Sequence, residues 1–206
     1  MRDELFNEGH YRLANGRCST TSFAKDFLLA NTSWLNVVGE AFLDEIQITY
    51  PLVEFDGFVG AQTHGSVLAS TVGVLSKLRH GETKLTFRAE RDGSGFFIRP
   101  ALAPLIAGKK LFLLEDMIDT GKTVKKVIAL SVKYGFEVIA VIAMLNRHQD
   151  IPYNLRGLLV TWLASVELPE QSFPCEQCSR RIPFDEDYSQ PSWLNKSWKV
   201  IQTLRG

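Results

Sequence analysis

The sequence is poor in cysteine, has no excess of charge of either sign and contains no long apolar run. Its three cysteines, Cys18, Cys175 and Cys178, form an odd and sparse set, which favours a reducing compartment over a disulfide framework. Lysine plus arginine and aspartate plus glutamate both total 23, so the net charge is zero and the composition indicates no nucleic-acid or membrane partner. The longest clean apolar stretch, residues 138–145, is too short to span a bilayer and predicts a buried strand.

Targeting signals, repeats and low-complexity tracts are also lacking. Acidic residues stand within positions 1–8, where a signal peptide would need a basic start and an apolar run, so a cytoplasmic location is predicted. The chain has 206 residues, of which 45% are hydrophobic, and this is enough to bury one sizeable core and to carry a small appendage. One main domain is therefore expected.

A regular alternation of strands and helices begins after Asp56. Before it the pattern is mixed, with a short helix expected over 3–8, a pair of short strands over 11–23 and a helix over 34–46. After it the apolar segments predict strands at 57–61, 84–88, 110–115, 136–145 and 157–165, helices at 65–78 and 121–134, and a glycine-bearing loop at 89–94.

This alternation predicts an α/β fold with an open, doubly wound parallel sheet, because strands joined by helical crossovers run parallel and are covered on both faces. We expect three parts: an accessory amino-terminal segment (1–50), an α/β core (51–167) and a carboxyl-terminal tail (168–206). The tail contains four prolines and ends in a helical pattern at 192–204. Its Trp193 and Trp198 are expected to pack on the core or on a partner subunit.

Residues 111–123 join a buried strand, two carboxylates, a turn and a helix start in the order Leu-Phe-Leu-Leu-Glu-Asp-Met-Ile-Asp-Thr-Gly-Lys-Thr. Glu115 and Asp116, at the strand end, offer acceptors for the two hydroxyls of a sugar diol. The loop 119–123 offers backbone amides, two hydroxyls and a helix amino terminus, which together favour a phosphate monoester. Gly121 allows close approach of the backbone. A ligand with a ribose diol near a phosphate fits both halves of the segment.

Two other interpretations explain this segment less well. A simple helix cap at residues 121–123, with the acids at a solvated strand end, leaves the full ordered set unexplained. A nucleoside triphosphate loop would need glycine five residues before Gly121, where Asp116 stands. The ordered set instead resembles the signature with which type I phosphoribosyltransferases bind 5-phosphoribosyl 1-diphosphate (PRPP): four apolar residues, two acids, two apolar residues and Asp-Thr-Gly-x-Thr.

The resemblance implies a PRPP-dependent transferase that uses Mg2+. It places Glu115, Asp116 and Arg88 at the reacting centre, and the two acids near a Mg2+ ion that is held mainly through PRPP and water. Residues 56–65 form a strand and a glycine-ended turn that resemble the pyrophosphate loop of the family, although any strand-turn-helix crossover looks similar. The PRPP-binding residues implied by the two loops are Gln62, Thr63, His64, Gly65, Asp119, Thr120, Gly121, Lys122 and Thr123.

Further resemblance points to the orotate branch of the family. Residues 10–19 look like the hood segment of those enzymes, which implies that Ala14 and Phe23 lie at the base. Arg147 resembles the arginine that faces the base carboxylate, a role that suits a planar guanidinium. The mobile loop of the orotate enzymes carries lysines and a histidine, whereas the matching segment here has Arg88 and Arg91. Fewer cations weaken the stabilisation of a departing pyrophosphate.

The nucleobase and the extent of turnover therefore stay open. Orotate is expected, but a purine or another pyrimidine would keep the sugar site and change the residues around the base. A non-catalytic regulator that binds PRPP or a nucleotide is the alternative from another class, and the sparse cationic loop favours it. A nucleic-acid-binding regulator is disfavoured by the neutral charge. The family also suggests a homodimer.

The cysteine pair and the histidines have simpler interpretations. Cys175 and Cys178 have the spacing of half a zinc knuckle, but a tetrahedral site needs four ligands, and only Cys18 and scattered histidines remain. Free thiols are favoured, and a zinc ion shared between subunits is the other option. His10, His80 and His148 are expected to be surface or turn residues.

Overall fold

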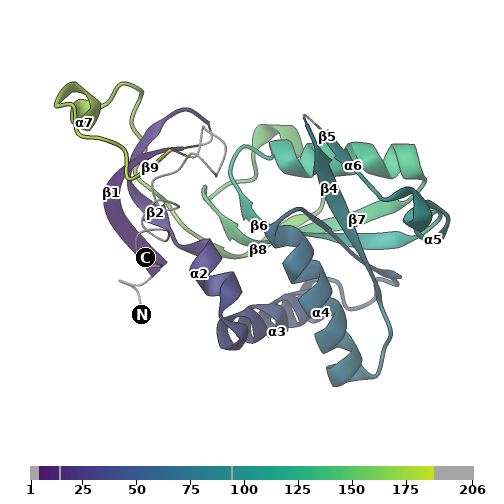
Figure 1. Ribbon diagram of the computed structural model, residues 1–206. Helices are drawn as coiled ribbons and strands as arrows, with labels where there is room; N and C mark the ends of the chain where they lie inside the picture. The colour runs from purple at the N-terminus through teal and green to yellow at the C-terminus, as the bar shows by residue number, and fades with distance from the viewer. Residues whose placement is uncertain (1–4, 14, 94, 188–206) are drawn as a thin grey trace, which may run out of the picture. The chain divides into compact units, whose positions relative to one another are not determined.

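The computed structural model describes residues 5–13, 15–93 and 95–187, which form two compact units (Figure 1). The larger unit spans residues 28–167, and the smaller unit combines residues 1–27 with 168–206. The larger unit includes helix α3 (Thr32–Thr49), which the sequence-based division assigned to the accessory segment. Helix α3 packs on helix α4 (His64–His80), because Gly39 leaves room for the side chains of Leu75 and Thr71.

The larger unit is built on a six-stranded sheet with the strand order β5-β4-β3-β6-β7-β8. All neighbouring strands pair in parallel except β5, which pairs with β4 in antiparallel orientation at one edge. The predicted α/β fold with an open parallel sheet is confirmed. The strands are β3 (Gly57–Ala61), β4 (Leu85–Asp92), β5 (Gly95–Phe97), β6 (Lys110–Ile118), β7 (Glu137–Asn146) and β8 (Val160–Ser165).

Both faces of this sheet are covered. Residues 111–114 of β6 are fully buried, and alternate side chains point to opposite faces. Leu111 and Leu113 share an apolar cluster with Val124 and Val127 of helix α6 (Lys122–Tyr134). On the other face the ring of Phe112 contacts Tyr50 and Phe55, with centroid distances of 5.3 and 4.8 Å, and helices α3 and α4 lie on that side (Figure 1). Burial on both faces explains why residues 111–114 are apolar without interruption.

The expected strands and helices of the larger unit are present, with bounds that differ by a few residues. The largest difference lies at 89–94, where a loop was expected but β4 continues to Asp92 and turns back as β5. Arg91 pairs with Phe96 across this hairpin, and its guanidinium lies 5.2 Å from the ring centroid. Short helices that were not expected are α2 (Lys25–Ala30), η1 (Pro100–Leu102), α5 (Ala103–Ile106) and η2 (Tyr153–Leu155).

The smaller unit contains a three-stranded sheet with the order β2-β1-β9. Strands β1 (Phe6–Arg12) and β2 (Cys18–Phe23) form the predicted antiparallel pair, and β9 (Glu186–Asp187) lies parallel to β1. The helix expected at 3–8 is wrong for residues 6–8, which belong to β1. There Phe6 pairs with Phe23 across the strands, with ring centroids 5.4 Å apart.

The carboxyl-terminal segment joins the amino-terminal strands in this unit. The amide and carbonyl of Cys18 exchange hydrogen bonds of 2.9 Å with those of Gln171. A single helical turn, α7 (Glu176–Ser179), follows along the chain. The helix expected at 192–204, with Trp193 and Trp198, lies outside the described residues.

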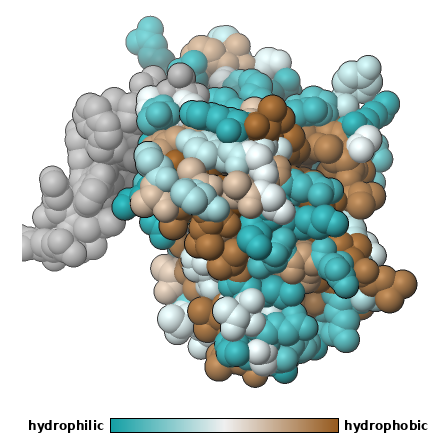
Figure 2. All heavy atoms as spheres, turned by 90° about the vertical axis from the view of Figure 1, so that its right-hand side faces the viewer, coloured by the Kyte–Doolittle hydropathy of each residue, from teal (hydrophilic) through white to brown (hydrophobic). Residues whose placement is uncertain are grey.

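The exposed side chains are mixed in character. Hydrophilic and hydrophobic residues are interspersed over the face shown in Figure 2. Within 5–13, 15–93 and 95–187, none of the helices is both long and apolar enough to cross a membrane.

Candidate active site

The two predicted loops meet at the point where the strand order of the parallel sheet reverses. Strand β3 has β4 on one side and β6 on the other, so the crossover through α4 and the crossover through α6 lead in opposite directions. Pairing of Gly60 with Leu114 sets the carboxyl ends of β3 and β6 side by side. Ligands of open α/β sheets bind at such a point, beyond the carboxyl ends of the strands.

The acidic pair lies within the last part of β6, which runs three residues further than predicted. Glu115 and Asp116 are buried, with exposed fractions of 5% and 6%. Because side chains alternate along a strand, Asp116 shares the α4 face with Phe112 and Leu114. Its Oδ2 atom lies 3.2 Å from Nδ1 of His64, the first residue of α4. The structure thus brings a residue of the acidic pair and a residue of the pyrophosphate loop into contact.

The turn after β6 depends on Gly121. This residue has φ = +71°, in the left-handed region, and caps the start of α6. A Cβ atom at this position would lie 2.8 Å from Cγ of Leu155 and 3.0 Å from Oδ1 of Asn154. Glycine is therefore required both for the backbone conformation and for the space.

The helices that start at this edge have no side-chain caps. Neither Thr63 before α4 nor Gly121 before α6 accepts a hydrogen bond from the first helical turn through a side chain. Helix α3 is different: Oδ1 of Asn31 accepts from the amides of Ser33 and Trp34, at 3.0 and 3.3 Å. First-turn amides without side-chain acceptors suit an anion, and here two such helix starts flank one acidic pair.

Glycines also allow α4 to begin directly on the sheet. A Cβ atom on Gly60 would lie 1.9 Å from the carbonyl oxygen of Gly65, and one on Gly65 would lie 2.7 Å from that of Leu114. The short turn between them contains Gln62 and Thr63, which are exposed and joined by a cis peptide bond. The close packing sets the start of α4 against the carboxyl end of β6.

The segment after β7 contacts the predicted phosphate loop. Pairing of Ile118 with Asn146 brings the following residues together, and Nη1 of Arg147 lies 3.9 Å from Oδ2 of Asp119. Nε2 of His148 lies 3.3 Å from Oδ1 of the same carboxylate. His148 was expected to be a surface or turn residue, and it is exposed, but its contact with Asp119 was missed. The parallel register of β6 and β7 is the signal that would have found it.

The other predicted residues are divided between the two units. Arg88 lies on β4 and is exposed, and Oε1 of Gln62 accepts a hydrogen bond of 2.9 Å from the amide of Arg91 on the same strand. Phe23 ends β2 in the smaller unit. Ala14 lies outside the described residues. The larger unit therefore holds the residues predicted for PRPP, together with Arg147.

Comparison with known proteins identifies this arrangement. The phosphoribosyl transferase domain matches residues 58–154, which contain the acidic pair and both loops. Residues 58–154 are therefore a phosphoribosyl transferase domain, and the chain is similar to the type I phosphoribosyltransferases. The orotate phosphoribosyltransferase of Thermotoga maritima is 29% identical over 192 residues, which cover 89% of this chain and 91% of that protein.

Solved structures of other phosphoribosyltransferases share the fold. The orotate phosphoribosyltransferase of Francisella tularensis matches with a TM-score of 0.61 and 14% identity, over 80% of this chain and 82% of that one. The orotate phosphoribosyltransferase of Mycobacterium tuberculosis H37Rv in complex with PRPP matches with a TM-score of 0.53 and 14% identity, over 70% and 81% of the two chains.

Proposed function

We propose that this phosphoribosyltransferase transfers ribose 5-phosphate from PRPP to orotate and releases pyrophosphate. The observation that carries the proposal is the pair of helix starts without side-chain caps, one on each side of Glu115 and Asp116. PRPP presents two anionic ends separated by a sugar, and this order of groups matches it. The names of the relatives that cover most of the chain support orotate as the base.

Each part of PRPP has an assigned position. The 5-phosphate would accept hydrogen bonds from the loop Asp119, Thr120, Gly121, Lys122 and Thr123, at the start of α6. The ribose hydroxyls would donate to Glu115 and Asp116. The pyrophosphate would bind at residues 62–65, where the start of α4 supplies amides. Arg88, from β4, would add a positive charge.

The chemistry follows from these positions. As pyrophosphate leaves, the anomeric carbon gains positive character, and the two buried carboxylates stabilise that charge more strongly than they would in water. His64, whose Nδ1 faces Asp116, would donate a hydrogen bond from Nε2 to the pyrophosphate when both of its ring nitrogens are protonated. The base nitrogen then attacks from the opposite side, and the configuration at the anomeric carbon inverts.

The donor set of the site fits a magnesium ion. Carboxylate and phosphate oxygens are the ligands that Mg2+ prefers, and the ion usually keeps several waters. Since both carboxylates are buried, Mg2+ would contact Glu115 and Asp116 mainly through water and would bind chiefly to PRPP. When bound, the ion neutralises charge on the departing pyrophosphate.

Arg147 remains our candidate for the base carboxylate. Nη1 of Arg147 lies 3.9 Å from Asp119, beside the 5-phosphate loop, so the guanidinium would contact both this loop and the base carboxylate.

The remaining assignments concern the smaller unit and the assembly. Ala14 and Phe23 are proposed as base-binding residues of the smaller unit, and residues 1–50 and 168–206 as the hood and the tail. A cytoplasmic homodimer is proposed as the working form. Light scattering of the purified protein tests the dimer.

The test is pyrophosphate release from PRPP and Mg2+ with orotate, uracil, adenine, guanine or hypoxanthine, with PRPP binding measured by calorimetry. Release with orotate alone is expected. Release with another base assigns that base instead, and binding without release supports the non-catalytic regulator that the few loop cations favour.

Variants locate the activity in the site. Asp116→Asn and Thr123→Ala are expected to weaken PRPP binding by about tenfold or more, because each removes a hydrogen bond to a polar or charged group. Asp44→Asn, on the exposed side of α3, is the control and should bind PRPP normally. Unchanged affinity in both site variants would contradict the assignment.

A further inference from the structure

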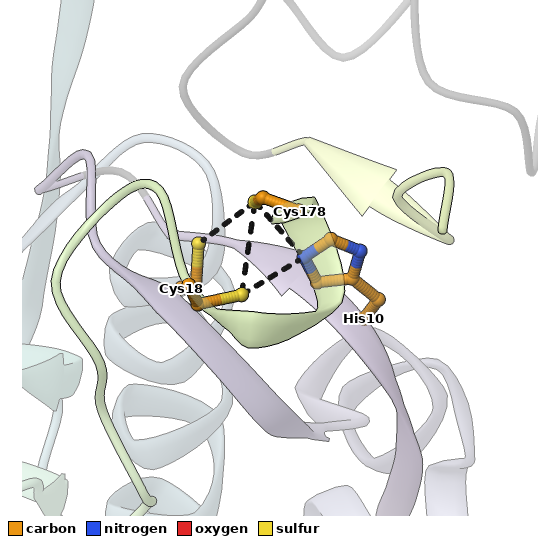
Figure 3. A group of neighbouring side chains, drawn as sticks. His10, Cys18 and Cys178 are labelled. Atoms are coloured by element: carbon orange, nitrogen blue, oxygen red, sulfur yellow. Dashed lines mark hydrogen bonds between the residues drawn. The ribbon is translucent and has the colours of Figure 1, made fainter. Parts of the chain in front are cut away.

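A second group of chemically reactive side chains lies in the smaller unit, away from the residues assigned to PRPP. Within the described ranges 5–13, 15–93 and 95–187, the ligand atoms of His10, Cys18, Cys175 and Cys178 all lie within 4.8 Å of one another. Figure 3 shows His10 of β1, Cys18 of β2 and Cys178 of α7 converging on one point, and Cys175 is the N-cap residue of α7. The sequence suggested half a zinc site at Cys175 and Cys178, with Cys18 and scattered histidines left over. His10 was expected to be a surface or turn residue, but the fold buries it beside the three cysteines.

Four of the six distances between these ligand atoms are close to those of a tetrahedral metal centre, and the other two are at most 4.8 Å. The Sγ atom of Cys178 lies 3.7 Å from that of Cys18 and 3.6 Å from that of Cys175. Nε2 of His10 lies 3.4 Å from Sγ of Cys175 and also from Sγ of Cys178. Zinc bonds of about 2.3 Å to sulfur and about 2.0–2.1 Å to nitrogen set tetrahedral ligands apart by about 3.8 Å for two sulfurs and about 3.6 Å for sulfur and nitrogen.

The imidazole of His10 is oriented for metal binding. Its Nδ1 atom lies 2.9 Å from the carbonyl oxygen of Ile182, which can only accept a hydrogen bond, so Nδ1 carries the proton. Nε2 is then the atom with the free electron pair, and it faces the sulfurs. A hydrogen bond of this kind, from the ring nitrogen that does not bind the metal to a carbonyl oxygen, is the usual support of a histidine ligand.

A disulfide explains the group less well. Sulfurs in a disulfide lie about 2.0 Å apart, whereas the sulfurs here are separated by 3.6–3.7 Å. A disulfide would also leave one of the three thiols over and give His10 no role. The three cysteines are free of disulfides in the structure.

Three of the four side chains are buried, and Cys178 is partly exposed. His10 and Cys18 are 1% exposed, and Cys175 is 7% exposed. Four protein ligands with no position left for water or substrate are typical of structural zinc, whereas catalytic zinc keeps one position open.

We propose that Nε2 of His10 and the sulfurs of Cys18, Cys175 and Cys178 bind one structural Zn2+ ion. Binding displaces one proton from each of the three thiols, and the neutral imidazole donates its electron pair. The ion joins strands β1 and β2 to the carboxyl-terminal segment, whose contacts otherwise include the Cys18–Gln171 pairing. This assignment goes beyond the proposed transferase activity and does not depend on it.

The first test measures zinc in the full chain, produced without a polyhistidine tag in zinc-supplemented medium. Mass spectrometry of the dissolved metal is expected to give one zinc per chain. Cys178→Ser and His10→Asn should lose it, whereas the matched control His80→Asn, at the end of α4, should keep it. Iron in place of zinc, or less than about a fifth of an equivalent of any metal, would overturn the proposal.

A second measurement uses the unsubstituted chain, so it does not depend on whether the variants fold. Progressive modification of the thiols by a mercurial reagent should release one zinc for every three thiols modified. Replacement of the ion by Co2+ should give the visible absorption of a tetrahedral cobalt thiolate centre. Octahedral cobalt, or thiols that react equally before and after chelation, would sink the assignment.

Discussion

The two units of this chain reach stability by different routes. In the larger unit a parallel sheet is covered on both faces, and β6 buries four consecutive apolar residues completely. In the smaller unit the described sheet has three strands rather than six, and two of the most buried side chains are His10 and Cys18, both 1% exposed. A small unit rarely buries enough apolar surface to be stable alone, so a metal ion commonly supplies the missing free energy. The larger unit has no such need.

Metal removal should affect the two units very differently, and this is the largest expected effect. Structural zinc contributes on the order of 10 kcal/mol in small domains, so chelation should unfold the smaller unit. Hydrogen exchange followed by mass spectrometry is expected to show fast exchange in peptides from β1 and β2 after chelation. Peptides from β6 and β7 should stay protected. Equal loss of protection in both units would remove the distinction.

A core substitution should have the opposite pattern. Leu113→Ala is expected to lower the free energy of unfolding of the larger unit by about 2–5 kcal/mol, because it leaves a cavity between β6 and α6. The matched control is Val132→Ala on α6, where the side chain is 85% exposed and the change should be within about 0.5 kcal/mol. Urea unfolding measures both, and the zinc content of the folded Leu113→Ala protein should stay unchanged.

Substitution of the two glycines at the ends of α6 distinguishes an effect on the stability of the larger unit from an effect on PRPP binding. Gly121 and Gly135 have φ values of +71° and +70°, so alanine at either position costs roughly 1–2 kcal/mol of backbone strain. A Cβ atom at Gly135 meets no atom within 4 Å, whereas one at Gly121 meets Leu155. Calorimetry should therefore show at least about a tenfold loss of PRPP affinity for Gly121→Ala, and normal affinity for Gly135→Ala. Equal affinities would argue against the loop as the phosphate site.

The smallest expected effect lies at the amino end of β6. The amide of Lys110 donates to Asp56 at 2.8 Å and the ammonium of Lys109 at 3.1 Å, and these contacts hold the pKa of Asp56 below its ordinary value. A carboxylate with a lowered folded-state pKa stabilises the protein above its unfolded pKa, and this contribution is lost as the pH falls through the folded value.

Asp56→Asn should therefore cost less than about 1 kcal/mol at pH 7, because the carboxylate is partly exposed. Urea unfolding curves of the variant and the unsubstituted chain should approach one another as the pH falls below the ordinary pKa of an aspartate, about 3.9. A difference that persists in acid would show that the charge of Asp56 is not the cause.

Much of what the sequence could predict depends on residues that lie close together along the chain. The strand that carries Glu115 and Asp116 and the turn at Gly121 lie within thirteen residues, so the sequence alone predicts the groups that they offer to a ligand. The apolar alternation likewise predicted the parallel sheet, because the periodicity of a buried strand or helix is a local property.

The contacts that tertiary structure decided join residues far apart in the chain. His10 and Cys175 are separated by 165 positions, and the fold brings them within 3.4 Å. The contact of His64 with Asp116 and that of Asp119 with His148 likewise depend on which strands are neighbours and on their register. No local pattern encodes such pairings, because many arrangements of the same elements satisfy the same propensities. Only packing of the whole chain selects the one in which these side chains meet.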